Sequence, residues 1–215
     1  MTGFSGSPRV LKAGLVLMDR DSGAVLRVIV LQYNPDALSR SLKLRGPAED
    51  GDRLEALRLS GPPVETLNIE AALDATDALE DEQDTAIRHG VAADLAAIET
   101  VLYPPAADLE ARDALAARGA IEILPALAPL VLFVWGAKRI LPVRITDFSV
   151  TEEAFDPELN PIRARVTLGM RALSVNDLPF ASRGGGLGLA NHRLKETLAG
   201  LVGGRLAALG AEDLG

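Results

Sequence analysis

Short apolar runs separated by turn residues fill the first part of the chain. Apolar residues mix with single polar ones along residues 9–19 and again, with many β-branched side chains, along residues 24–33. An Asp/Ser/Gly turn at residues 19–23 separates the two runs, which is typical of a β-hairpin. Asn34 and Pro35 end the second strand, because proline cannot donate a hydrogen bond to a neighbouring strand.

More strands are expected before residue 75. Residues 37–45 alternate imperfectly, and two further strands flank the turn at Gly61, Pro62 and Pro63. After that turn, apolar residues from Leu67 onward alternate with polar residues. The alternation predicts a strand with one buried and one solvated face.

The periodicity then changes to that of a helix. Apolar residues recur at spacings of four and three, which predicts one amphipathic helix preceded by the acidic residues 81–84. Residues 106–119 predict a second, shorter helix that stops at Gly119. The apolar stripe of the first helix consists of Ile87, Val91, Leu95, Ile98 and Leu102.

Strand patterns return after the helices. One strand is expected to end at about Trp135 and another to span residues 138–150, with a bulge near Thr146 that reconciles its two apolar faces. Residues 162–172 give the clearest alternation of the chain. A Gly-rich joint at residues 183–188 then leads to a C-terminal helix over about 191–209.

The order of strands, helices, strands and helix predicts an antiparallel α+β protein. Residues 1–175 are expected to form a β domain with a helical segment at about 82–118. Residues 176–190 would be a Gly-rich joint, and residues 191–215 a C-terminal helical extension.

Composition narrows the function classes. The 215 residues include no cysteine, which excludes disulfides, thiolate metal sites and cysteine nucleophiles. The net charge of -8 argues against binding to nucleic acid or to anionic lipid. No apolar stretch is long enough to span a bilayer, and the first residues lack the order of a secretory signal, so we expect neither membrane insertion nor secretion by that route.

Candidate chemistry is sparse. The acidic run from Asp74 to Asp84 lacks the order of a calcium loop, and the Gly-rich segment fits neither a phosphate loop nor a dinucleotide fingerprint. His89 and His192 are far apart in sequence, and nothing beside either would activate it. We therefore expect no catalytic residue, no bound cofactor or metal, and no enzymatic activity.

One strand carries a row of cations. Arg163, Arg165 and Arg171 share a face, with Arg139 and Arg144 nearby. The row is either an ordinary solvated face or a basic surface for an acidic partner or a neighbouring subunit.

Three segments together resemble the tube-domain proteins of contractile injection systems, which are phage-tail-like particles. The segments are LQYNPDALSRS, LAPLVLFVWG and VRITDFSVTEEAFDPELNPIRARVTLGMRAL, and their order covers most of residues 9–173. Only the combination is specific. The residues that match the family pattern are Tyr33, Asn34, Pro35, Pro129, Leu132, Phe133, Trp135, Gly136, Phe148, Pro161, Arg163 and Ala164.

The chain also departs from that family. Pro142 and Asn160 stand where glycine is common, and the helix at residues 106–119 looks like an insertion. The tail from Ser174 is too short, and wrongly patterned, for the peptidoglycan-binding LysM module that many relatives carry. Direct contact with peptidoglycan is therefore in doubt.

The resemblance implies an antiparallel β-sandwich or barrel of the phage tail-tube type, with an intervening helix, a helical insertion and a C-terminal helix. It implies a hexameric ring that acts as a tube–baseplate adaptor or tube initiator, with the spike hub, the inner tube protein and other baseplate proteins as partners. Assembly would take place in the cytoplasm, in a particle that either stays in the cell or is released. Trp135 would pack in the core, with Gly136 allowing the next turn.

Two alternatives stay open. The first is a bulk inner-tube protein of the same particle, which the helical insertion and the C-terminal helix disfavour, since identical stacked rings need self-complementary faces. The second is a small-molecule enzyme or binding domain that uses the acidic run and a histidine.

Overall fold

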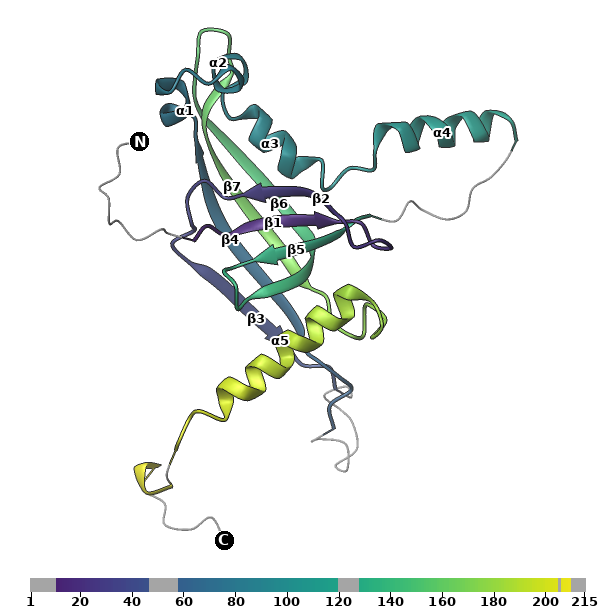
Figure 1. Ribbon diagram of the computed structural model, residues 1–215, viewed down its shortest axis with the longest axis vertical. Helices are drawn as coiled ribbons and strands as arrows, with labels where there is room; N and C mark the ends of the chain where they lie inside the picture. Colours follow the sequence, from purple (N-terminus) through teal and green to yellow (C-terminus); the bar gives the residue numbers. More distant parts are fainter. Residues whose placement is uncertain (1–10, 47–57, 120–127, 205, 210–215) are drawn as a thin grey trace.

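One antiparallel sheet of seven strands organises the residues that the computed structural model describes, which are 11–46, 58–119, 128–204 and 206–209 (Figure 1). The strands follow the order β2-β1-β5-β6-β7-β4-β3 across the sheet. The strands are β1 (Gly14–Met18), β2 (Val25–Val30), β3 (Leu38–Lys43), β4 (Val64–Asp74), β5 (Leu130–Val134), β6 (Ile140–Phe155) and β7 (Pro161–Ala172). The helices are α1 (Thr76–Glu80), α2 (Asp84–His89), α3 (Ala92–Glu99), α4 (Ala106–Ala117), α5 (Arg183–Ala199) and the 3₁₀ helix η1 (Leu206–Leu209).

The sheet curls, so that the short strands β1, β2 and β5 cross the long strands β4, β6 and β7 (Figure 1). The core lies between the two parts, and Leu15 and Phe133 of the short strands share one buried cluster with Leu67, Val166 and Met170 of the long ones. The expected α+β class with an antiparallel sheet is confirmed.

Over the described residues, the sheet does not close into a barrel, and its tail-tube type stays a prediction. A closed barrel needs two neighbours for every strand. Strands β2 and β3 each pair with one strand only among the described residues, so the sheet stays open at both edges.

The hairpin of β6 and β7 confirms two predictions. The register shifts between Ile145 and Asp147, which is the bulge expected near Thr146. Beyond the bulge, Phe148 packs against the core. Along β7, the predicted alternation also holds: its apolar side chains from Ala164 to Met170 are buried, whereas Arg163, Arg165 and Thr167 are exposed.

The expected single helix over the stripe from Ile87 to Leu102 is wrong, because the stripe is divided between the two short helices α2 and α3, and a third short helix, α1, precedes them. Gly90 separates α2 from α3 with a φ of 54°, a value that helical residues do not adopt. Val91, Leu95 and Ile98 are buried as the stripe predicts. Its two ends, Ile87 and Leu102, are exposed, and Leu102 lies beyond the end of α3.

The expected Gly-rich joint is the beginning of α5. The Ser182 hydroxyl caps this helix by accepting a hydrogen bond from the Gly185 N–H at 3.1 Å. A Cβ on Gly185 would lie 2.1 Å from the Pro179 carbonyl oxygen, so glycine here lets the helix pack against the preceding loop. The helix ends at Ala199, ten residues earlier than expected. A division of the chain near residue 175 stays a prediction.

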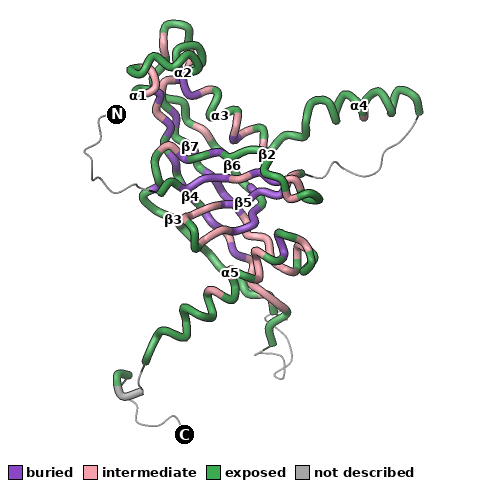
Figure 2. The backbone as a smooth tube through the Cα atoms, viewed as in Figure 1, coloured by how far each residue is buried: buried purple, intermediate pink, exposed green. Residues whose placement is uncertain are grey.

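Helix α4 agrees with its sequence prediction, whereas the strand expected before Gly61 is not seen in the described residues. Helix α4 forms where the second helix was expected, and Gly119 follows it with a φ of 77°. It extends away from the sheet, and none of its residues is buried (Figures 1 and 2). The strand expected before Gly61 lies mostly outside the described residues, and residues 58–60 form no strand.

Candidate assembly surfaces

One face of the four strands β3, β4, β7 and β6 is polar along its whole length. The paired rows place serine, threonine, asparagine and charged side chains on this face and leave the aliphatic ones on the other, buried face. The face comprises Ser39, Ser41, Thr66, Asn68, Glu70, Ala72, Asp74, Arg144, Asp147, Ser149, Thr151, Glu153, Arg163, Arg165, Thr167, Gly169 and Arg171.

Three arginines of this polar face, Arg163, Arg165 and Arg171, are paired with carboxylates, which favours an ordinary solvated face over a basic surface. Arg163 Nε lies 2.7 Å from an Asp74 oxygen, and Arg165 lies 3.1 Å from Glu70 and 3.5 Å from Glu153. Burial raises the pKa of Asp74, but hydrogen bonds from Thr76 and the charge of Arg163 outweigh it, so this pKa lies below its usual value. The alternating charges make the face hydrophilic without a strong net sign.

Both sides of this four-stranded unit have unpaired strand edges. Strand β3 pairs only with β4, and β6 pairs with β5 only over residues 140–143. Among the described residues, no strand covers the outer side of β3 or the outer side of β6 from Arg144 onward. Open edges of this kind are templates for pairing with another chain.

The third open edge, β2, is apolar. Val25, Leu26, Val28 and Val30 are each 55–58% exposed, although β2 pairs with β1 throughout its length. Soluble proteins usually protect edge strands with charges or proline, and β2 carries one charge, Arg27, beside this apolar patch.

The Tyr33-Asn34-Pro35 motif fixes the loop between β2 and β3. The Asn34 amide accepts a hydrogen bond from the Ala13 N–H and donates one to the Leu11 carbonyl, both at 2.8 Å. Pro35 is buried, whereas Tyr33 is exposed and lines a hollow of about 540 Å³ together with Arg165. The Asn34 side chain thus fixes the chain just before β1. The residue type alone did not predict this role.

The other motif residues lie in two places. Trp135 is half-buried at the end of β5, with its ring centroid 5.8 Å from that of Phe133, and Gly136 forms the following turn with a φ of 78°. Pro161 begins β7, and its carbonyl accepts a hydrogen bond from the Val91 N–H at 2.8 Å. Ala164 is buried, and Arg163 is on the polar face. The motifs therefore do not gather into one site, and their status as family landmarks stays a prediction.

Helix α5 is attached to the far edge of the sheet by an ion-pair cluster. Glu65 of β4 is buried, and its carboxylate lies 2.6 Å from Lys195 Nζ of α5 and 3.0 Å from Arg40 Nε of β3. The β4 alternation already places Glu65 on the buried face with Leu67. A glutamate at an apolar position was therefore a signal that sequence analysis missed.

The loop between β7 and α5 is held by a second carboxylate, that of Asp177. Ser174 donates its backbone N–H and its hydroxyl to Asp177 Oδ2 at 3.0 and 3.1 Å, and Arg171 of β7 bonds the other oxygen. Burial raises the pKa of Asp177, but these hydrogen bonds and the Arg171 charge outweigh it and hold the pKa below its usual value.

Replacing Asp177 with asparagine is expected to lower the free energy of unfolding at pH 7 by about 1–2 kcal/mol. A depressed carboxyl pKa stabilises the fold above the unfolded pKa of about 4, and this stabilisation is lost as the pH falls through the lower folded value. Urea unfolding of both proteins between pH 7 and pH 2 should show the difference shrinking below about pH 4. A constant difference would show that the loss does not depend on the charge of the carboxylate.

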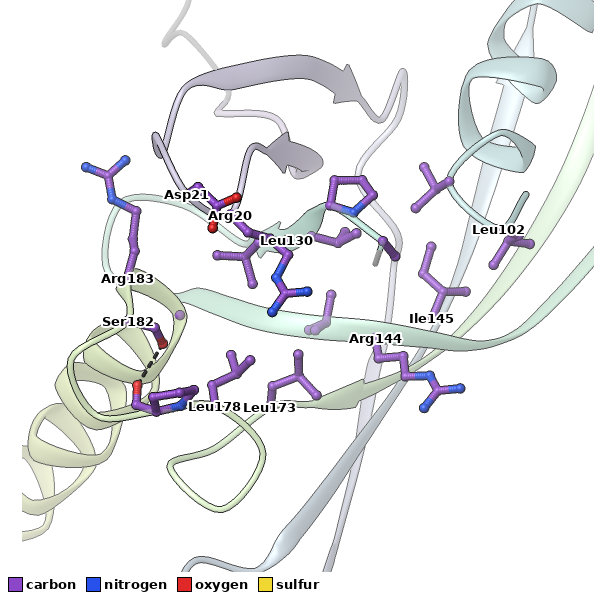
Figure 3. A pocket seen from close by; sticks show the side chains of 17 residues that line it. Arg20, Asp21, Leu102, Leu130, Arg144, Ile145, Leu173, Leu178, Ser182 and Arg183 are labelled. Carbon is purple, nitrogen blue, oxygen red and sulfur yellow. Dashed lines mark hydrogen bonds between the residues drawn. The ribbon is translucent and has the colours of Figure 1, made fainter. Parts of the chain in front are cut away.

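A cavity of about 630 Å³ opens where β6 separates from β5 (Figure 3). Its walls include Leu130, Ile145 and Leu178. Arg20 of the β1–β2 turn and Arg144 of β6 also line it, and neither makes an ion pair within the described residues.

The two histidines lie on separate helices. The structure does not bring the histidines together, since His89 ends α2 and His192 is exposed on α5, 3.7 Å from Glu196. In the described ranges, no three His, Asp or Glu side chains are placed to hold a metal ion. The helices described there include none long and apolar enough to cross a membrane.

Known proteins show little similarity to this chain. No family model matches the chain, and no curated protein matches it. One solved structure with some likeness is the tail of an empty GTA particle with C6 symmetry. It is 12% identical with a TM-score of 0.28, over 74% of this chain and 90% of that one. At this score the likeness is weak.

Proposed function

We propose that the chain is a ring-forming structural subunit of a contractile injection particle. The observation that carries the proposal is the four-stranded unit β3-β4-β7-β6, which has one polar face and an unpaired strand at each side. An unpaired edge is filled when the same unit of another copy adds to it, and repetition around an axis closes a ring.

The strand directions favour this arrangement. Each strand of the unit is antiparallel to the next, so β3 and β6 run in opposite directions. When copies are related by rotation about an axis, β6 of one copy therefore meets β3 of the next as another antiparallel pair. The polar face would then line a hydrophilic channel, and the apolar face would stay inside each subunit.

The finer role we propose is a hexameric adaptor between spike hub and inner tube, acting as tube initiator. The resemblance to tube-domain proteins supports it, as do α4 and the end of α5, which give the ring features that a plain tube ring would not need. The alternative is a bulk inner-tube protein. Electron microscopy of the purified protein separates the two, because an adaptor forms discrete rings and a tube protein forms long tubes.

Disulfide cross-linking tests the ring itself, since the chain has no cysteine of its own. A Ser39→Cys chain in β3 is mixed in turn with Asp147→Cys, Ser149→Cys and Thr151→Cys chains, which sample positions along β6. We expect one of the β6 positions to give a linked dimer under mild oxidation. The matching double variant should give a ladder of bands that ends at the number of subunits in the ring.

A Leu159→Cys chain is the control, because Leu159 is exposed at the turn between β6 and β7, away from β3. It should give no dimer with Ser39→Cys. If no β6 position links to β3, and the protein stays monomeric at all concentrations, the ring proposal is wrong.

A further inference from the structure

The last residues of α5 leave the body of their own subunit. Lys195 contacts Glu65 of β4, which lies beside the edge strand β3, so the helix has reached the edge of the sheet at that point. The exposed segment beyond it extends away from the sheet (Figure 2). Leu201 and Val202 in this segment are 76% and 80% exposed. We call residues 196–204 the C-terminal arm.

Beyond β3, in the proposed ring, lies the β6 edge of the next copy. The cavity described above opens at the start of that edge, because Arg144 and Ile145 are the first β6 residues that β5 no longer pairs with. An arm that crosses β3 is therefore directed toward the neighbour's cavity rather than toward its own.

The chemistry of the two surfaces is complementary. The arm offers Leu198, Leu201 and Val202, and the cavity offers apolar walls that include Leu130 and Leu178. The carbonyl end of a helix carries a partial negative charge, and α5 has no basic residue in its last turn. In the cavity, Arg20 and Arg144 make no ion pair among the described residues, and with Arg183 they outnumber the one carboxylate of the lining, Asp21.

We propose that the C-terminal arm of one copy docks into the β5–β6 cavity of the adjacent copy. The proposal rests on the proposed ring and names the residues that bind its subunits together. The contact covers apolar side chains that each subunit leaves in solvent, and the two arginines interact with the end of the neighbour's helix.

Cross-linking between two single-cysteine chains tests the docking. A Val202→Cys chain is mixed with a Leu102→Cys chain, whose cysteine lines the cavity, so any mixed disulfide joins different copies. We expect a dimer that forms as readily as the β3–β6 dimer, whereas Val202→Cys with Leu159→Cys should give none. If β3 links to β6 but position 202 does not link to position 102, the docking is wrong and the ring stands. If neither pair links, both proposals fail.

A pair of charge variants gives an independent readout. Leu201→Glu should raise the protein concentration needed for half-maximal ring formation about tenfold or more, because a carboxylate replaces a side chain buried in the contact. Leu159→Glu is the matched control, since Leu159 is 78% exposed and lies at the β6–β7 turn. Sedimentation velocity measures both, and circular dichroism should show an unchanged monomer fold. Equal effects of the two variants would overturn the docking.

Discussion

Replacing Gly90 with alanine is expected to lower the free energy of unfolding by roughly 2–5 kcal/mol. The added Cβ would lie 2.1 Å from the Pro161 carbonyl oxygen, and the φ of 54° is strained for any side chain. The same carbonyl accepts the hydrogen bond from Val91 that starts α3, so neither backbone can move away without losing it. Urea unfolding followed by circular dichroism measures the change.

Gly136→Ala is the matched control for that substitution. Gly136 has a similarly positive φ of 78°, but a Cβ there would meet no atom within 4 Å. It should therefore cost only the backbone strain, about 1 kcal/mol. If Gly90→Ala costs no more than Gly136→Ala, the close contact with Pro161 is not what requires glycine.

Phe133→Ala is expected to destabilise the protein by about 3–5 kcal/mol, and Trp135→Ala by only about 2 kcal/mol. Phe133 is fully buried among core side chains, whereas Trp135 packs against the edge of that core and is half-buried. Phe133→Leu should lose much less than Phe133→Ala, because most of the volume stays filled. Unfolding must be followed by circular dichroism, since Trp135 is the only tryptophan.

The opposite ranking would contradict this assignment. A larger loss for Trp135→Ala than for Phe133→Ala would place the tryptophan at the centre of the core, as the sequence interpretation had it. A stable Trp135→Ala protein that fails only in ring formation would instead assign Trp135 to a subunit contact.

The strands with alternating apolar and polar residues could be predicted from the sequence, because each such pattern depends on one strand alone. The alternation along β7 and the bulge near Thr146 follow from which residues avoid water, and the structure confirms both. The extent of the helices was harder to predict. The middle of the apolar stripe from Ile87 to Leu102 is buried, as predicted. The helix break at Gly90, however, depends on contacts with Pro161, which lies seventy-one positions later in the chain.

The Gly-rich segment misled for a related reason. Composition favours a flexible joint, because glycine lowers helix propensity. Tertiary packing overrides that preference, since Gly184 and Gly185 are buried against the loop that precedes them. The surfaces that support the proposed function are mostly features of sheet order. Which strand edges stay open depends on pairings between distant segments, so no local pattern could indicate them.

Helix α4 has a consequence for how an assembled ring would behave mechanically. None of its residues is buried, so melting it would expose no core side chain and would hardly weaken the fold. Twelve residues of helix are also marginal by themselves in water. Whether α4 stays folded in a ring would therefore depend on the neighbouring layer that it contacts. Such an appendage can absorb a poor fit between neighbouring layers, which a stiff β-sheet cannot do.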